Sequence, residues 1–128
     1  MKYMTYFPDL SPYRYSDSTQ SMLNVGWLAR EHPFPTGTAP EGLVETLAEL
    51  AKHSVNVQRG MHFCELCPDF QTARQNTSRC DTFIGSGEIR VPGSKRVTYA
   101  SPAMIVHYVE EHSYLPPAEY CEAVMRTT

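Results

Sequence analysis

Residues 64–67 read Cys-Glu-Leu-Cys, and residues 107–112 read His-Tyr-Val-Glu-Glu-His. Two cysteines separated by two residues can direct both sulfurs at one tetrahedral ion, and a later pair of histidines supplies the nitrogens that complete many structural zinc sites. The pattern therefore predicts one zinc ion (Zn2+) held by Cys64, Cys67, His107 and His112. Such a site would tie the two segments together and decide the fold between them.

The two histidines are predicted to lie on one helix that departs from ideal geometry. Residues five apart lie about 140° apart around an ideal α-helix, so both imidazoles cannot point at one ion from a regular helix. Pro116 and Pro117 follow closely. We therefore expect the helix to end near His112 and its last turn to loosen.

Other ligand sets are open at this stage. His62 lies two residues before Cys64 and is the alternate fourth ligand in place of His112. Cys80 and Cys121 could complete a four-cysteine site, although Cys121 would then have to leave the apolar face of a short helix. Without a metal, the cysteines would be reduced thiols in the core, where free Cys is common.

The size and composition of the chain favour one folded domain over residues 1–128. The sequence has 41% hydrophobic and 20% charged residues, as globular domains do. Its net charge of −3, with no run of Lys or Arg, argues against nucleic acid or anionic lipid as a partner. No stretch approaches the roughly 20 apolar residues of a membrane span. We expect a cytoplasmic protein, whose four cysteines serve as metal ligands or buried thiols rather than disulfides.

Three segments have helical patterns. Thr38 to Glu41 reads as a capping box ahead of a helix over about 40–52, whose apolar residues recur at spacings of three and four. Ser101 and Pro102 favour the N-cap and first position of a second helix, over about 102–112. A short terminal helix is expected after the prolines, from residue 118.

Strand patterns are shorter and are separated by turns. Residues 21–28 and 55–58 have the β-branched and apolar content of strands, with Gly26 as a candidate bulge. Residues 88–91 and 96–99, joined by Pro-Gly-Ser-Lys, predict a hairpin. The polar stretch 69–81 predicts a surface loop.

Together these elements predict an α+β fold with a small antiparallel sheet and two or three helices. The order of cysteine knuckle, loop, hairpin and helix resembles the treble-clef group of zinc folds. It departs from that pattern because His107 and His112 lie beyond the first turn of the helix.

A wider resemblance covers most of the chain. Six blocks resemble an uncharacterised family of small bacterial proteins: residues 23–28, 32–37, 59–67, 87–91, 99–108 and 112–117. The resemblance implies a metal-binding domain whose pattern includes His62, both knuckle cysteines and both later histidines, without an established activity. Cys80 and Cys121 lie outside these blocks, which makes them less attractive as ligands.

The sequence favours a non-catalytic interaction or regulatory module over an enzyme. In such a module zinc takes the place of a larger hydrophobic core, and the partner is expected to be another protein of unknown identity. Aromatic residues near the N-terminus could form the contact surface or pack onto the domain; these are Tyr6, Phe7, Tyr13, Tyr15 and Phe34.

The alternative is a zinc-dependent hydrolase, in which three ligands leave an open metal position for water and a carboxylate acts as base. Glu65, Glu88 and Glu111 are candidate bases, although each is more typical of a surface charge or an ion pair. The chain has no H-E-x-x-H helix. A nucleophilic role for a knuckle thiol beside His62 is weaker, because two closely spaced cysteines more naturally share a metal. A redox role is weaker still, because Pro68 and a polar stretch follow the knuckle where redox motifs continue into a helix.

Overall fold

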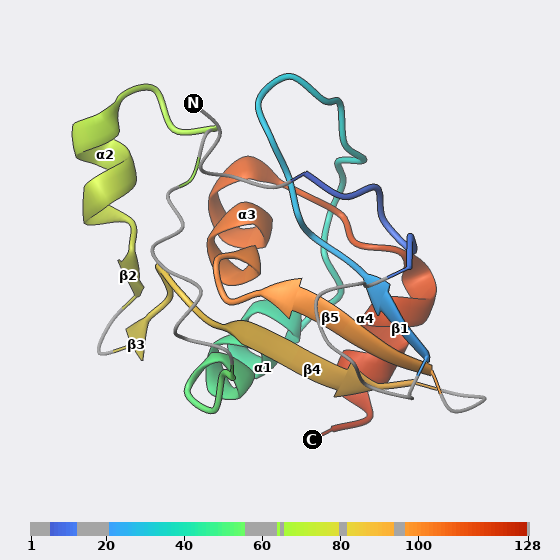
Figure 1. The fold of residues 1–128 in the computed structure, drawn as a ribbon. Coiled ribbons are helices and arrows are strands. Elements are labelled where there is room, and N and C mark those ends of the chain that lie inside the picture. The colour runs from blue at the N-terminus through green and yellow to red at the C-terminus, as the bar shows by residue number, and fades with distance from the viewer. Residues whose placement is uncertain are drawn as a thin grey trace.

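Four helices and five strands make up the described part of the chain, which comprises residues 6–12, 21–55, 64, 66–79, 82–93 and 97–127 of a computed structural model (Figure 1). In chain order they are β1 (Ser21–Asn24), α1 (Leu43–Ala51), α2 (Phe70–Gln75), β2 (Ser78–Arg79), β3 (Thr82–Phe83), β4 (Glu88–Pro92), β5 (Val97–Pro102), α3 (Ile105–His112) and α4 (Ala118–Met125). The predicted α+β class is confirmed. The number of helices exceeds the predicted two or three because α2 was not expected.

The main sheet has the strand order β1-β5-β4 and is mixed. β4 and β5 form the predicted antiparallel hairpin, with Ile89 opposite Ser101. β1 pairs with β5 in parallel, from Ser21 opposite Val97 to Asn24 opposite Ala100. The prediction of a purely antiparallel sheet is therefore wrong. Two strands joined by a tight turn have to be antiparallel. β1 and β5 are joined instead by a long connection that includes α1, and such a connection also permits parallel pairing.

Short segments pair with the two outer strands of this sheet. At β1, the Leu10 amide donates to the Asn24 carbonyl at 2.6 Å, and the Asn24 amide donates to the Ser11 carbonyl at 2.8 Å. At β4, Val55 and Glu88 exchange both backbone hydrogen bonds, at 2.8 and 2.7 Å. The predicted strand 55–58 is thus present at its first residue, and residues 56–58 lie outside the described part.

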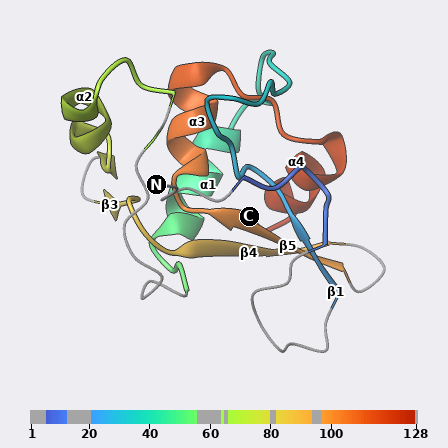
Figure 2. The same cartoon turned by 45° about the horizontal axis from the view of Figure 1, so that its top comes forward.

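Three helices form the core together with the sheet. α1 packs against α3, α4 and β4, and α4 also packs against β4 (Figures 1 and 2). The largest side chains in this core are fully buried and include Leu43, Leu47, Ile105, Tyr108 and Tyr120. Among the described residues, no helix is long and apolar enough to cross a membrane.

Residues 66–79 and 82–85, which carry α2, β2 and β3, lie to one side of the main sheet in both views (Figures 1 and 2). We call this part the α2 lobe. The prediction of a loop over 69–81 was wrong, because Asp69 caps a helix: its carboxylate accepts the Thr72 amide at 2.7 Å. Only Ala73 of α2 is buried, so the helix leaves no apolar stripe in the sequence.

Two predicted helix starts were also wrong. The capping box Thr38–Glu41 does not form, because α1 begins one residue after Gly42, which has a φ of 87° and no side-chain cap. Ser101 and Pro102 do not begin α3, since they are the last residues of β5 and pair with Ile89 and Glu88. The hairpin continues two residues into the segment whose local pattern favours a helix.

Gly26 is required by its backbone angle and by the close approach of α3. Its φ is 83°, and a Cβ atom there would lie 2.6 Å from the Ile105 Cδ1 atom and 2.9 Å from its Cγ1 atom. The Gly26 amide donates to the Asp9 carboxylate at 3.0 Å. Gly26 lies after β1 rather than in it, so it is not the predicted strand bulge.

Replacing Gly26 with Ala should lower the free energy of unfolding by about 2–4 kcal/mol, because strain from the left-handed backbone adds to overpacking against Ile105. Gly42→Ala is the matched control. Gly42 also has a positive φ, but its added Cβ would meet only the flexible end of Met125, at 3.3 Å. Urea unfolding of both variants measures the difference.

The double variant Gly26→Ala/Ile105→Val isolates the clash with Ile105. Because Val lacks the Cδ1 atom, we expect the two substitutions together to cost less than the sum of the single costs. Equal losses in Gly26→Ala and Gly42→Ala, with additive behaviour of the double variant, would contradict the packing argument.

Candidate metal centre

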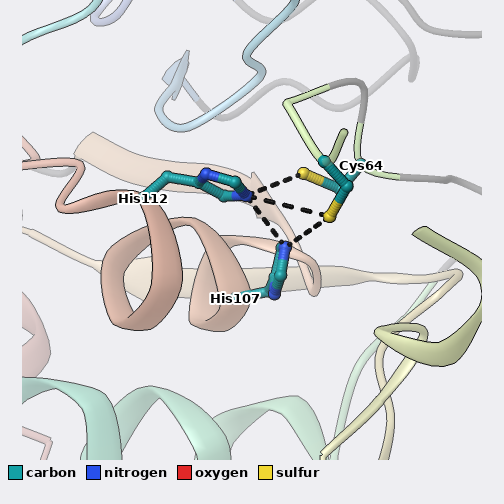
Figure 3. A group of neighbouring side chains, drawn as sticks. Cys64, His107 and His112 are labelled. Atoms are coloured by element: carbon teal, nitrogen blue, oxygen red, sulfur yellow. Dashed lines mark hydrogen bonds between the residues drawn. The ribbon is translucent and has the colours of Figure 1, made fainter. Parts of the chain in front are cut away.

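Four ligand-type atoms converge between the cysteine knuckle and α3 (Figure 3). The Cys64 Sγ atom lies 3.4 Å from the His112 Nε2 atom, and the Cys67 Sγ atom lies 3.3 Å from the His107 Nε2 atom. The two Nε2 atoms are 3.1 Å apart. All four atoms lie within 4.8 Å of one another, so the structure brings together the four side chains that the sequence predicted as ligands.

These distances match the edges of one tetrahedral coordination sphere. Zn–S bonds of about 2.3 Å and Zn–N bonds of about 2.0–2.1 Å place S and N about 3.5 Å apart, and two N atoms about 3.3 Å apart. Three of the four S–N distances are 3.3, 3.4 and 3.9 Å, the N–N distance is 3.1 Å, and every other pair lies within 4.8 Å. The cluster could therefore hold one metal ion with little rearrangement.

The end of α3 brings His112 to the same side as His107 (Figure 3). Ser113, directly after the helix, has a φ of 57°, and its amide donates to the Tyr108 carbonyl five residues back. An α-helix uses the carbonyl four residues back, so the chain widens at this turn. The expected loosening of the last turn is present, and it allows two histidines five residues apart to face one point.

Burial of the cluster sets the protonation of its side chains. Cys64, Cys67 and His107 are at most 4% exposed. Burial raises the pKa of the Cys64 thiol to about 12 and lowers the pKa of His107 to about 4, and it also lowers the pKa of His112. The imidazoles are thus neutral, as metal ligands must be, and the Cys64 thiol would lose its proton to solvent when a metal binds.

Two polar side chains support Cys67 from outside the cluster. The Asn76 amide nitrogen donates to the Cys67 sulfur at 3.5 Å, and the Arg30 guanidinium donates to the Cys67 carbonyl at 2.9 Å. Contacts of this kind orient the ligands of metal sites. The sequence analysis missed both residues. Asn76 is the C-cap of α2, and neither its residue type nor its spacing in the sequence marks it as a support for Cys67.

A comparison with models of known protein families shows which family the chain belongs to. The model of the domain of unknown function DUF7919 matches residues 5–125. The chain belongs to this family. The match confirms an uncharacterised family, as expected, and the bacterial source stays a prediction. No curated protein and no solved structure matches this DUF7919 chain.

The other proposed ligands fall outside the cluster or outside the described residues. Cys121 lies on α4, where its buried thiol contacts the Pro116 carbonyl at 3.7 Å, so the four-cysteine site is wrong with respect to Cys121. His62 and Cys80 lie outside the described part of the chain. The alternative with His62 in place of His112 stays a prediction, and His112 lies within 4.8 Å of the other three ligand atoms.

The two candidate catalytic bases in the described part of the chain, Glu88 and Glu111, do not join the cluster. Glu88 is 1% exposed, and its carboxylate accepts hydrogen bonds from Arg90 at 2.9 and 3.3 Å. Glu111 is exposed on α3, and neither carboxylate belongs to the group of ligand atoms. Glu65 lies outside the described residues. Glu88 therefore has the ion pair that the sequence analysis gave as its ordinary role.

The N-terminal aromatic residues pack onto the domain. Tyr6 stacks on His32, with ring centroids 3.7 Å apart. Phe7 meets Trp27 edge to face at 5.7 Å. In the same way Phe34 meets Tyr114, a fully buried residue, at 6.0 Å. Of the two possibilities raised for these rings, packing is observed for these three; Tyr13 and Tyr15 lie outside the described part.

Ser113 offers a test of the widened turn. Its side chain is exposed, so substitutions there act mainly through the backbone. Ser113→Gly should raise the free energy of unfolding by about 0.5–1 kcal/mol, because Gly has no Cβ penalty at positive φ. Ser113→Val should lower it by about 1–2 kcal/mol. Chemical denaturation measures both free energies of unfolding. Glu111→Gly and Glu111→Val, at an exposed position inside α3, are the controls. If Gly is also more stable than Val there, the widened turn is not the cause.

Proposed function

We propose that this chain is a small zinc-binding module with a structural, four-ligand site, which acts by interaction with another protein rather than by catalysis. The observation that carries the proposal is the convergence of two sulfur and two nitrogen ligands, each pair on its own segment, within 4.8 Å. The site would tie the knuckle to α3 across about forty residues of intervening chain.

The donor set supports zinc. Two thiolates and two imidazoles in tetrahedral spacing are typical of Zn2+, whereas Mg2+ and Ca2+ prefer oxygen ligands in larger shells. None of the four clustered side chains is a carboxylate. Zinc therefore fits the cluster better than a hard cation does.

The number of protein ligands supports a structural rather than a hydrolytic role. Catalytic zinc sites use three protein ligands and keep the fourth position for water or substrate. Here four side chains of ligand type lie within 4.8 Å of one another, enough to supply all four positions, and three of them are buried. No comparable observation favours the hydrolase.

The proposed compartment and the proposed class of partner rest on the chemistry of the cysteines and on the net charge of the chain. The described cysteines Cys64, Cys67 and Cys121 are free thiols. Ligand thiols have to stay reduced, which the cytoplasm ensures, and so the proposal places the module there as a single domain over 1–128. The partner is proposed to be a protein, because the net charge of −3 does not suit nucleic acid.

Metal content tests the site directly. We expect about one zinc per chain by elemental mass spectrometry of tag-free protein, and loss of that zinc in both Cys64→Ser and His107→Ala. Cys121→Ser is the matched control for a buried thiol, and His53→Ala is the control for an exposed histidine. Both controls should retain the metal.

Thermal unfolding completes this test. Removal of zinc should lower the Tm, because a ligand bound only to the folded state at 1,000 times its Kd contributes about 4 kcal/mol. Loss of zinc in Cys64→Ser but not in His107→Ala would remove His107 from the ligand set and redirect the site to His62 or Cys80. A parent protein that contains no zinc, and takes up none when it is added, would refute the proposal.

A further inference from the structure

The elements of the α2 lobe are too short to be stable alone. α2 has six residues, and β2 and β3 have two residues each. Isolated helices shorter than about 12 residues are marginal in water, and so is a lone two-stranded hairpin. The order of the lobe therefore has to come from its attachment to the rest of the domain.

Apolar burial supplies little of that attachment. The buried apolar side chains of α2, β2, β3 and the residue after β3 are Ala73 and Ile84. The two large aromatic side chains of the lobe are mostly outside the core, since Phe70 is 65% and Phe83 46% exposed. Hydrophobic burial, the main stabilising term in folding, is thus small here.

Both ends of α2 are instead tied to Cys67. Its N-cap, Asp69, lies two residues after this cysteine. Its C-cap, Asn76, returns to donate a hydrogen bond from its side chain to the Cys67 sulfur at 3.5 Å. A metal-bound sulfur carries negative charge and accepts such a bond more strongly than a thiol does.

We infer that metal occupancy controls the folding of the α2 lobe: bound metal holds Cys67 and the lobe built on it, and metal removal releases the lobe while the rest of the domain stays folded. This inference rests on the proposed function. Beyond that function, it assigns to the metal control over the folding of the α2 lobe, which carries the exposed side chains of Phe70 and Phe83.

The rest of the domain has its own core. α1 packs against α3, α4 and β4, and α4 packs against β4; the buried side chains of these helices, such as Leu47, Tyr108 and Tyr120, lie outside the lobe. Sub-global unfolding of a weakly packed unit, with the remaining core intact, is common in proteins. The lobe and the core therefore differ in what stabilises them.

Hydrogen exchange measured by mass spectrometry tests this separation on the full chain. Zinc-loaded protein is compared with the same protein after chelation, with metal content measured in both samples. Exchange in peptides from residues 66–79 should rise by about tenfold or more, while peptides from β5 and α4 should stay protected over the same labelling times.

Each outcome has a distinct meaning. Loss of zinc without faster exchange in the lobe overturns the inference and leaves the proposed function standing. Equal acceleration over the whole chain also overturns it, because the lobe would not be a separate unit. A chain that never binds zinc overturns both.

A variant outside the ligand set provides the second arm. Asn76→Ala removes the hydrogen bond to Cys67, and Gln75→Ala, at the exposed neighbouring position of α2, is the control. With zinc still bound, Asn76→Ala should accelerate exchange in the lobe and weaken zinc affinity by about tenfold in a chelator competition. Behaviour identical to Gln75→Ala would overturn the role of Cys67 as the anchor of α2.

Discussion

The structure depends on the burial of α3. The five consecutive residues from Ile105 to Val109 are all buried, so this helix faces protein on every side at its start. Apolar side chains there are satisfied by the core, but a buried imidazole is costly without a polar partner. His107 finds its partner in the Cys67 sulfur, at 3.3 Å. This contact joins the cysteine knuckle, and the lobe after it, to the buried helix.

Sequence patterns predicted the elements whose stability is local. The hairpin around Pro92, and the helix that follows Pro116 and Pro117, are present because turn chemistry and proline act on their immediate neighbours. The patterns were wrong where a distant pairing decides. Ser101 and Pro102 have the ideal residue types for a helix start, but the hydrogen bonds of the β4–β5 ladder extend through them.

The candidate site likewise has a part that sequence patterns predicted and a part that they did not. The two spacings, C-x2-C and H-x4-H, were enough to select four side chains that the structure brings together. Asn76 and Arg30 could not be selected, because neither residue type nor spacing marks a side chain that supports a ligand from another element. The α2 helix was missed for a related reason, since Ala73 is the one buried residue in it and leaves no periodic pattern.

The coverage of the two sheet edges restricts how other chains can associate with this domain. An open strand edge is a template for adding strands, which leads to aggregation or to partners that bind by β-augmentation. Here Leu10 and Ser11 cover β1, Pro12 lacks an amide to offer, and Val55 pairs with β4. Over the described residues, backbone recognition is therefore blocked at Leu23 and Asn24 of β1 and at Glu88 of β4, and a partner there would have to recognise side chains.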